Sequence, residues 1–300
     1  MSALDIGKGV VGQCRLRNKL IQSVDHCSTR PRMHLSVSTE PLWIDTPHGR
    51  LFACRWFPEG GVSHPEKPPI ILFHDSLGCV ALWRDFPEQL CRATGLEVIA
   101  YDRLGFGQSD AYPGPIPLQF IGDEGAQFFV HLKTALGIED FIAFGHSVGG
   151  AMAAVCASLY AQSCTALITV SAQAFVEDRT LDGIRVAQEQ FAQPGQMGRL
   201  EKYHGAKAPW VLAAWTDTWL SPAFSGWTIE STVDGIECPL LAIHGQYDEY
   251  GSDLHPKRIA RLSAGPGDYL IVGDCHHVPH REAPETVLAA VSEFLGAAVR

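Results

Sequence analysis

A serine at position 147 lies in a sequence pattern that suits nucleophilic chemistry. Residues 145–149 read Gly-His-Ser-Val-Gly, and they close an apolar run that begins at Phe141. Where a strand turns sharply into a helix, the side chain at the turn is lifted above the sheet, and glycines on both sides let the backbone pass without a clash. Ser147 is therefore the candidate nucleophile.

A serine hydroxyl is a weak nucleophile unless a histidine takes its proton and a carboxylate orients that histidine. Asp248 and His277 follow two later apolar runs in the order acid, then base. Both are therefore expected at the carboxyl edge of the sheet, where catalytic groups gather. Two groups of neighbours compete for these roles, His276 and His280 for the base, and Glu249 and Glu177 for the acid.

The negative oxygen formed during acyl transfer also needs hydrogen-bond donors. We expect the backbone N–H of Val148, which follows the nucleophile, and that of Ser76 in the loop after the apolar run 70–73. Asp75 and Ser76 would equally end that strand and cap the next helix. The two interpretations are compatible because the oxyanion role uses backbone atoms.

Apolar runs and turn residues indicate the elements that must position these side chains. Six continuous apolar runs are typical of strands buried on both faces, and two earlier runs flank a Pro- and Gly-containing turn at residues 46–49 that predicts an antiparallel hairpin. The expected strands are 42–45, 50–57, 70–73, 97–102, 141–145, 165–171, 240–245 and 269–273. Helical spacing of apolar residues predicts helices at 83–94, 118–136, 147–161, 254–262 and 283–298.

The alternation of strands and helices predicts an α/β fold in which helices flank a mostly parallel, eight-stranded sheet. Between the sixth and seventh strands lies a segment that is too long for a simple crossover and has no strand character. We therefore expect a helical cap at 176–237, a core formed by 39–175 and 238–300, and a poorly ordered N-terminal extension at 1–38.

The cap segment is rich in aromatic residues, and some of them are expected to line a substrate cleft. Trp210, Trp215 and Trp219, together with His146 beside the nucleophile, are the candidate substrate-binding residues. For each tryptophan the alternative is that it only holds the cap against the core.

The order of elements, the turn at Ser147, Asp248 and His277 resemble the α/β-hydrolase superfamily over residues 42–298. The segment 102–109 is similar to the Asp-x-x-Gly-x-Gly-x-Ser loop of that superfamily, which is usually structural. Asp75 and His276 depart from it, since each occupies a position where the superfamily commonly has glycine. The resemblance implies the α/β-hydrolase fold with a helical cap after strand 6.

The resemblance also implies a serine hydrolase that needs no metal or organic cofactor. Ser147 would attack an ester, lactone, thioester or amide carbonyl of a small to medium, partly apolar substrate, and water would release the acyl group. A C–C bond hydrolase of the meta-cleavage type is disfavoured, because His146 precedes the serine and Val278 follows the histidine. A non-catalytic ligand-binding protein on the same fold is the other alternative.

Composition restricts the partners and the compartment. Lys and Arg number 23 and Asp and Glu 33, giving a net charge of −10, the wrong sign for binding nucleic acid. The longest apolar runs are far shorter than the roughly 18 residues that span a membrane. Nine cysteines without a Cys-x-x-Cys pair predict a reducing, cytoplasmic location and no metal site. The predicted partner is a small-molecule substrate, and a homo-oligomer is a possible assembly that the sequence neither favours nor excludes.

The first 32 residues differ from the rest, with six basic and only two acidic side chains. They lack the apolar core and cleavage site of a secretory signal, although their composition weakly resembles a transit peptide. The favoured interpretations are a poorly ordered extension or a reading frame whose true start is Met33.

Overall fold

The computed structural model describes residues 35–59 and 67–298. Most of the expected N-terminal extension, the alternative start at Met33, and Cys14 and Cys27 therefore lie outside the described residues. The first strand begins at Val37, so residues 37–38, which the prediction assigned to the extension, pair within the sheet.

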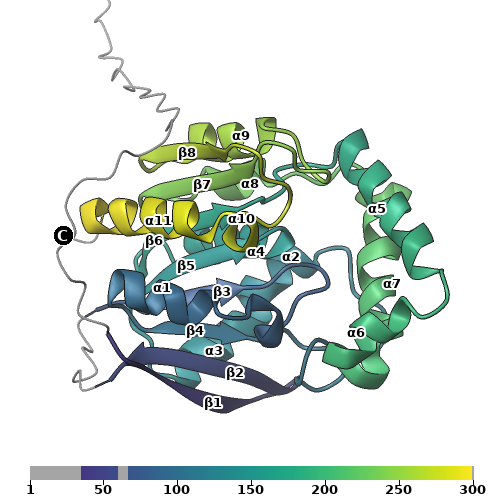
Figure 1. The fold of residues 1–300 in the computed structure, drawn as a ribbon, viewed down its shortest axis with the longest axis horizontal. Coiled ribbons are helices and arrows are strands. Elements are labelled where there is room, and N and C mark those ends of the chain that lie inside the picture. The colour runs from purple at the N-terminus through teal and green to yellow at the C-terminus, as the bar shows by residue number, and fades with distance from the viewer. Residues whose placement is uncertain (1–34, 60–66, 299–300) are drawn as a thin grey trace, which may run out of the picture.

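A single sheet of eight strands forms the centre of the molecule (Figure 1), in the order β1-β2-β4-β3-β5-β6-β7-β8. The hairpin of β1 and β2 is antiparallel, as predicted, and β2 also pairs antiparallel with β4, whereas all other neighbours are parallel. The strands are β1 (Val37–Thr46), β2 (Gly49–Pro58), β3 (Ile70–Phe73), β4 (Val98–Tyr101), β5 (Phe141–His146), β6 (Cys164–Val170), β7 (Leu240–Gly245) and β8 (Gly267–Val272). The predicted α/β-hydrolase fold with a mostly parallel sheet is confirmed.

Helices cover both faces of the sheet because alternate strand residues point to opposite sides. Ile70 and Leu72 of β3 pack in one core with α1 (Phe86–Thr94) and α11 (Pro284–Ala298). Ile71 and Phe73 pack in the other core, against helices from the middle of the chain. Those helices are α2 (Phe120–Asp123), the π-helical turn η2 (Glu124–Phe128), α3 (Phe129–Ala135), α4 (Val148–Leu159), α8 (Glu230–Val233) and α9 (Leu254–Leu262).

The segment after β6 contains no strand and forms a layer of helices beyond one end of the sheet, on the right in Figure 1. Its elements are α5 (Asp178–Phe191), α6 (Met197–His204), the short turn η3 (Gly205–Lys207), α7 (Ala208–Trp219) and the turn η4 (Pro222–Phe224). After η4 the chain returns to the core, since Ile229, Val233 and Ile236 are fully or almost fully buried there. The cap layer therefore consists mainly of α5, α6 and α7.

Two further features concern the described residues only. The seven cysteines among them are buried free thiols. Within residues 35–59 and 67–298, no helix is long and apolar enough to cross a bilayer.

Candidate active site

Ser147 occupies the turn that joins β5 to α4, and its backbone adopts an unusual conformation with φ 56° and ψ −128°. A positive φ in a residue with a Cβ costs on the order of 1–3 kcal/mol, so the surrounding structure has to hold it. The Ser147 N–H donates to Val170 O at 2.9 Å, which ties the turn to β6. A Cβ at Gly145 would lie 2.1 Å from Gly149 O, and one at Gly149 would lie 2.1 Å from Phe73 O. The glycines of the motif are therefore required by close backbone approach.

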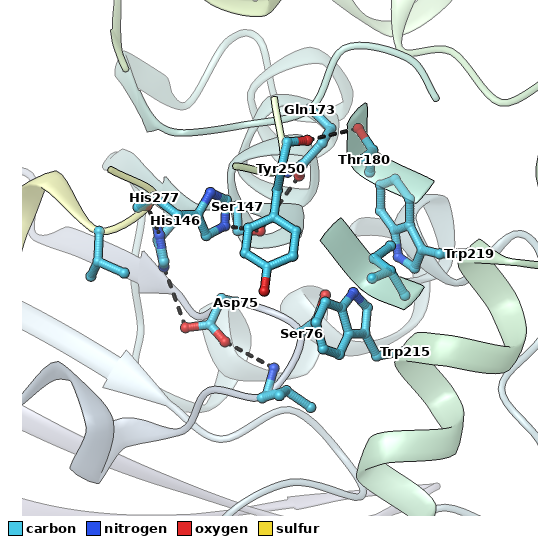
Figure 2. Close-up of a pocket in the computed structure, with 13 residues that line it drawn as sticks. Asp75, Ser76, His146, Ser147, Gln173, Thr180, Trp215, Trp219, Tyr250 and His277 are labelled. Carbon is cyan, nitrogen blue, oxygen red and sulfur yellow. Dashed lines mark hydrogen bonds and ion pairs between the residues drawn. The ribbon is translucent and has the colours of Figure 1, made fainter. Parts of the chain in front are cut away.

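The structure brings the predicted nucleophile, base and acid together in one hydrogen-bonded chain. His277 Nε2 lies 3.0 Å from Ser147 Oγ, as Figure 2 shows. His277 Nδ1 lies 2.9 Å from both carboxylate oxygens of Asp248. The Tyr250 N–H donates to Asp248 Oδ1 at 2.8 Å, and His244 Nε2 lies 3.3 Å from Asp248 Oδ2. The carboxylate thus has partners on several sides, although it is almost completely buried.

The charges in this chain make His277 a stronger base towards the proton of serine. Burial alone would raise the pKa of the Asp248 carboxyl, but the charge and hydrogen bond of His277 outweigh it and lower that pKa to about 2. Burial alone would lower the pKa of His277, but Asp248 outweighs it and raises that pKa above its ordinary value. Asp248 therefore stays ionised at neutral pH and fixes the tautomer of the base.

The competing histidines occupy other places. His276 is exposed, and its Nδ1 and its N–H both contact Glu282 Oε2, at 3.2 and 2.8 Å. His280 is buried against the rings of Trp83, Phe86 and His146. Neither has a hydrogen bond to Ser147 among the described residues. Glu282, which sequence reasoning missed, also accepts the N–H after His277 at 2.9 Å and so holds the loop on both sides of the base.

The competing acids also lie apart from His277. Glu177 accepts from His255 Nε2 at 2.9 Å and from the N–H and hydroxyl of Ser252, at 2.6 and 3.0 Å. Glu249 is exposed. Asp248 is therefore the carboxylate that the fold places on the base.

The two N–H groups predicted to bind an oxyanion belong to Ser76, in the loop after β3, and Val148, at the start of α4. Neither N–H donates a hydrogen bond within the part of the chain that the structure describes. The neighbouring Leu77 N–H is bonded to Asp75 Oδ1 at 2.8 Å. Asp75 is not among the non-glycine residues with positive φ, so its side chain fits this loop without backbone strain.

A pocket with a cavity volume of about 160 Å³ opens above Ser147, between the carboxyl ends of the strands and the cap. Its walls come from the loop after β3, the two loops that carry Asp248 and His277, and helices α5 and α7. The lining residues are Asp75, Ser76, Leu77, His146, Ser147, Gln173, Thr180, Ile184, Trp215, Trp219, Tyr250, His277 and Val278. Apart from the two histidines, no basic side chain is among them, and several are large and apolar, so the pocket suits an uncharged, partly apolar molecule.

Three of the four predicted substrate-binding residues, His146, Trp215 and Trp219, line this pocket. Trp210 is not among the residues that line it. Its ring stacks on Tyr112 with centroids 5.4 Å apart, and its Nε1–H donates to Gly114 O at 2.7 Å. Trp210 therefore holds α7 against the loop after β4, which is the alternative role that the sequence left open.

Sequence reasoning missed several lining residues, notably Gln173 and Tyr250. Gln173 Oε1 lies 3.5 Å from Ser147 Oγ, and the Tyr250 ring packs edge-on against the His277 ring with centroids 4.7 Å apart. Both follow strands that end at the catalytic edge, and this position was the only signal in the sequence that could have indicated them. Among the described residues, no group of three or more His, Cys, Asp or Glu side chains is arranged to hold a metal ion.

A sequence model of the family described as alpha/beta hydrolase fold matches residues 68–223, which is more than half of the chain. The chain belongs to this family. The match includes the loop after β3, the turn at Ser147 and most of the cap.

Curated relatives share a shorter part of this α/β-hydrolase chain. Over 112 residues it is 31% identical to the proteins named 1-acylglycerol-3-phosphate O-acyltransferase ABHD5 from Homo sapiens and Pongo abelii. The match covers 37% of this chain and 32% of each relative. The chain thus matches about a third of the length of these relatives.

Solved structures resemble this α/β hydrolase over most of its length. A proline iminopeptidase from Mycobacterium smegmatis aligns with a TM-score of 0.69 and 19% identity, over 86% of this chain and 98% of its own. A thermophilic esterase from Thermogutta terrifontis aligns with a TM-score of 0.65 and 21% identity, over 86% of this chain and 99% of its own. An enol-lactonase from Burkholderia xenovorans aligns with a TM-score of 0.65 and 18% identity, over 85% of this chain and 100% of its own. At these identities the likeness shows the shared fold.

Proposed function

We propose that this protein is a serine hydrolase that cleaves a carboxylic ester or a related acyl bond. The observation that carries most weight is the chain of hydrogen bonds from Ser147 Oγ through the His277 ring to the Asp248 carboxylate. Membership of the α/β-hydrolase family and the esterase and lactonase among the similar folds support the same reaction class.

In the proposed reaction, Ser147 Oγ forms a bond to the substrate carbonyl carbon while its proton passes to His277 Nε2. The N–H groups of Ser76 and Val148 stabilise the resulting oxyanion, and each such donor is typically worth about 3 kcal/mol. The intermediate collapses, and the leaving alcohol takes the proton from His277. Water, activated by the same histidine, then attacks the acyl group, and the carboxylic acid and free Ser147 are released.

The walls of the pocket suit a small to medium, uncharged substrate. Leu77, Ile184, Trp215 and Trp219 provide apolar surface, and Gln173 is a neutral polar group close to the nucleophile. A free carboxylate on the substrate would meet Asp75, and no Lys or Arg is among the described residues that line the pocket. We therefore propose neutral esters with short to medium acyl chains as substrates, and the cap helices α5 and α7 as the part that binds them.

The proposal is tested by treating the protein with a fluorophosphonate, which modifies activated serines, and locating the adduct by intact and peptide mass spectrometry. We expect a single adduct on Ser147, turnover of p-nitrophenyl esters, and the loss of both in Ser147→Ala. Ser225→Ala, which changes an exposed serine outside the pocket, serves as the matched control and should label normally. Folded wild-type protein that takes up no label would contradict the proposal and favour a ligand-binding role.

A further inference from the structure

Asp75 brings a carboxylate to the edge of an otherwise uncharged pocket, where it makes two contacts. Its Oδ1 accepts the Leu77 N–H at 2.8 Å, and its Oδ2 lies 3.3 Å from Nδ1 of His146. A third of the Asp75 side chain is exposed, whereas the His146 side chain is 3% exposed. Figure 2 shows the Asp75 carboxylate pointing towards His146, on the same side of the pocket as Ser76.

The second nitrogen of the His146 ring determines where its protons are. Nε2 lies 2.9 Å from the backbone oxygen of His277, and because a carbonyl oxygen only accepts, Nε2 has to carry a hydrogen. Burial alone would raise the pKa of the Asp75 carboxyl, but the hydrogen bond and charge of His146 outweigh it and hold that pKa well below its ordinary value. Asp75 Oδ2 is therefore a carboxylate oxygen that accepts a hydrogen bond from Nδ1. The His146 ring thus bridges the oxyanion loop to the backbone of His277.

Among the described residues, no other acidic side chain forms an ion pair or hydrogen bond with the His146 ring. Its ring is packed against Trp83, His277 and His280, with centroids 6.3, 5.1 and 4.6 Å away. Burial, followed by the charge of His146, lowers the pKa of His280 well below its ordinary value, so His280 is neutral. Asp75 is thus the acidic group that faces the His146 ring.

The other polar groups of the oxyanion loop are bonded elsewhere. Asp75 O accepts from Nδ1 of His74 at 2.8 Å and from Arg103 at 2.9 Å, and Leu77 O accepts from His204 Nε2 at 3.0 Å. With the Leu77 N–H taken by the Asp75 carboxylate, the Ser76 N–H is the donor that remains for a substrate oxygen. The Asp75 side chain therefore decides which N–H of the loop is available.

We infer that Asp75 and His146 are positioning residues that hold the oxyanion loop and the loop of His277 at a fixed separation. This inference rests on the proposed hydrolase function, because it concerns the alignment of the Ser76 N–H and the His277 ring with Ser147 Oγ. The oxyanion and the proton transfer to His277 arise in the transition state and the tetrahedral intermediate, and the bound substrate has neither. Loss of the pair should therefore reduce kcat and leave KM nearly unchanged.

Two substitutions at position 75 separate hydrogen bonding from simple packing. Asp75→Ala removes both contacts, whereas Asp75→Asn keeps an oxygen for the Leu77 N–H and offers an N–H to a neutral His146 Nδ1. With p-nitrophenyl butyrate, we expect Asp75→Ala to lower kcat about 10- to 100-fold, as is typical for residues that orient catalytic groups, with KM changed less than about threefold. Asp75→Asn should recover most of kcat. Asp253→Ala, a surface aspartate on the approach to α9, is the matched control and should equal the wild type.

Three kinetic results would overturn the inference. The first is an unchanged kcat in Asp75→Ala. The second is an increase in KM alone in that variant, which would make Asp75 a substrate-binding group. The third is an Asp75→Asn variant with a kcat as low as that of Asp75→Ala, which would mean that charge and not hydrogen bonding matters. A folded variant is recognised by its thermal transition. If Asp75→Ala fails to fold, Asp75→Asn and the measurement below still decide.

A measurement without substrate separates this inference from the proposed function. In ¹⁵N spectra of the histidine rings, assigned with a His146→Gln variant, we expect the Nδ1 signal of His146 to change between wild type and Asp75→Asn while Nε2 stays protonated. Identical Nδ1 signals would refute the pair even in an active enzyme. Conversely, a wild type that shows the pair but takes up no fluorophosphonate would refute the proposed function alone.

Discussion

Both carboxylate oxygens of Asp248 lie 2.9 Å from Nδ1 of His277, and the acid is almost completely buried. This contact leaves Nε2 of the ring as the acceptor that faces Ser147 Oγ at 3.0 Å. Because the carboxylate raises the pKa of His277, it makes the ring a stronger base while also extending the pH range in which the ring is protonated and inactive.

The pH dependence of hydrolysis should report this contact. Only the neutral His277 ring can take the proton of Ser147, so kcat/KM should rise with pH through the pKa of His277, above the ordinary value of 6.5. Asp248→Asn removes the negative charge, so the rising limb should move to lower pH while the plateau falls about 10²- to 10⁴-fold. Profiles of kcat/KM between pH 4 and 10 provide the check, and a limb at the same pH in both proteins would argue against Asp248 as the partner of the base.

The two adjacent histidines should respond very differently to substitution. His277→Ala removes the ring that contacts Ser147 and should reduce kcat at least about 10³-fold. His276→Ala removes an exposed ring that contacts Glu282, and the backbone contact of residue 276 to Glu282 is kept, so kcat should stay within about threefold. Steady-state rates with p-nitrophenyl butyrate measure kcat for both variants. A larger loss in His276→Ala would exchange the two assignments.

Local sequence signals were sufficient for the fold and for the candidate nucleophile, base and acid. Continuous apolar runs indicated the strands, and the end of a parallel strand specifies the edge at which a residue emerges, so Ser147, Asp248 and His277 could be placed together. The pocket walls could not be predicted in the same way. Whether Trp210 or Trp215 faces the substrate depends on how α7 packs against loops that are about 100 residues away in the sequence.

Asp75 illustrates the same limit inside the site. From the sequence it is a turn residue, which agrees with its bond to the Leu77 N–H. Its second contact joins it to His146, 71 positions later, and depends on the distance between β3 and β5 in the sheet. No local pattern carries that information, because the contact arises from the pairing of strands.

The two tryptophans of α7 provide a matched pair for testing the pocket. Trp215 lines it, so Trp215→Ala should raise KM for p-nitrophenyl butyrate about 3- to 10-fold, since a lost apolar contact costs on the order of 1 kcal/mol. Trp210→Ala should leave KM unchanged and lower the thermal transition, because that ring packs on Tyr112. Initial rates and melting curves of both variants are required. Equal changes of KM would mean that the cap acts on the substrate only through its overall stability.

Glu177 should make the stability of the protein sensitive to acid. It lies just before α5 and bonds to His255 and Ser252, so it connects the first cap helix to the loop after β7. Burial alone would raise the pKa of the Glu177 carboxyl, but these hydrogen bonds outweigh it and lower that pKa from 4.5 to about 2. A lowered pKa in the folded state means that the carboxylate stabilises the fold fully above pH 4.5, and that this contribution is lost as the pH falls towards 2.

Glu177→Gln should therefore be less stable than the wild type at pH 7, by about 2 kcal/mol for hydrogen bonds to a charged group, and the difference should shrink towards pH 2. Urea unfolding of both proteins across this range measures the difference, and a gap that stays constant with pH would show that the ionisation of Glu177 does not stabilise the cap.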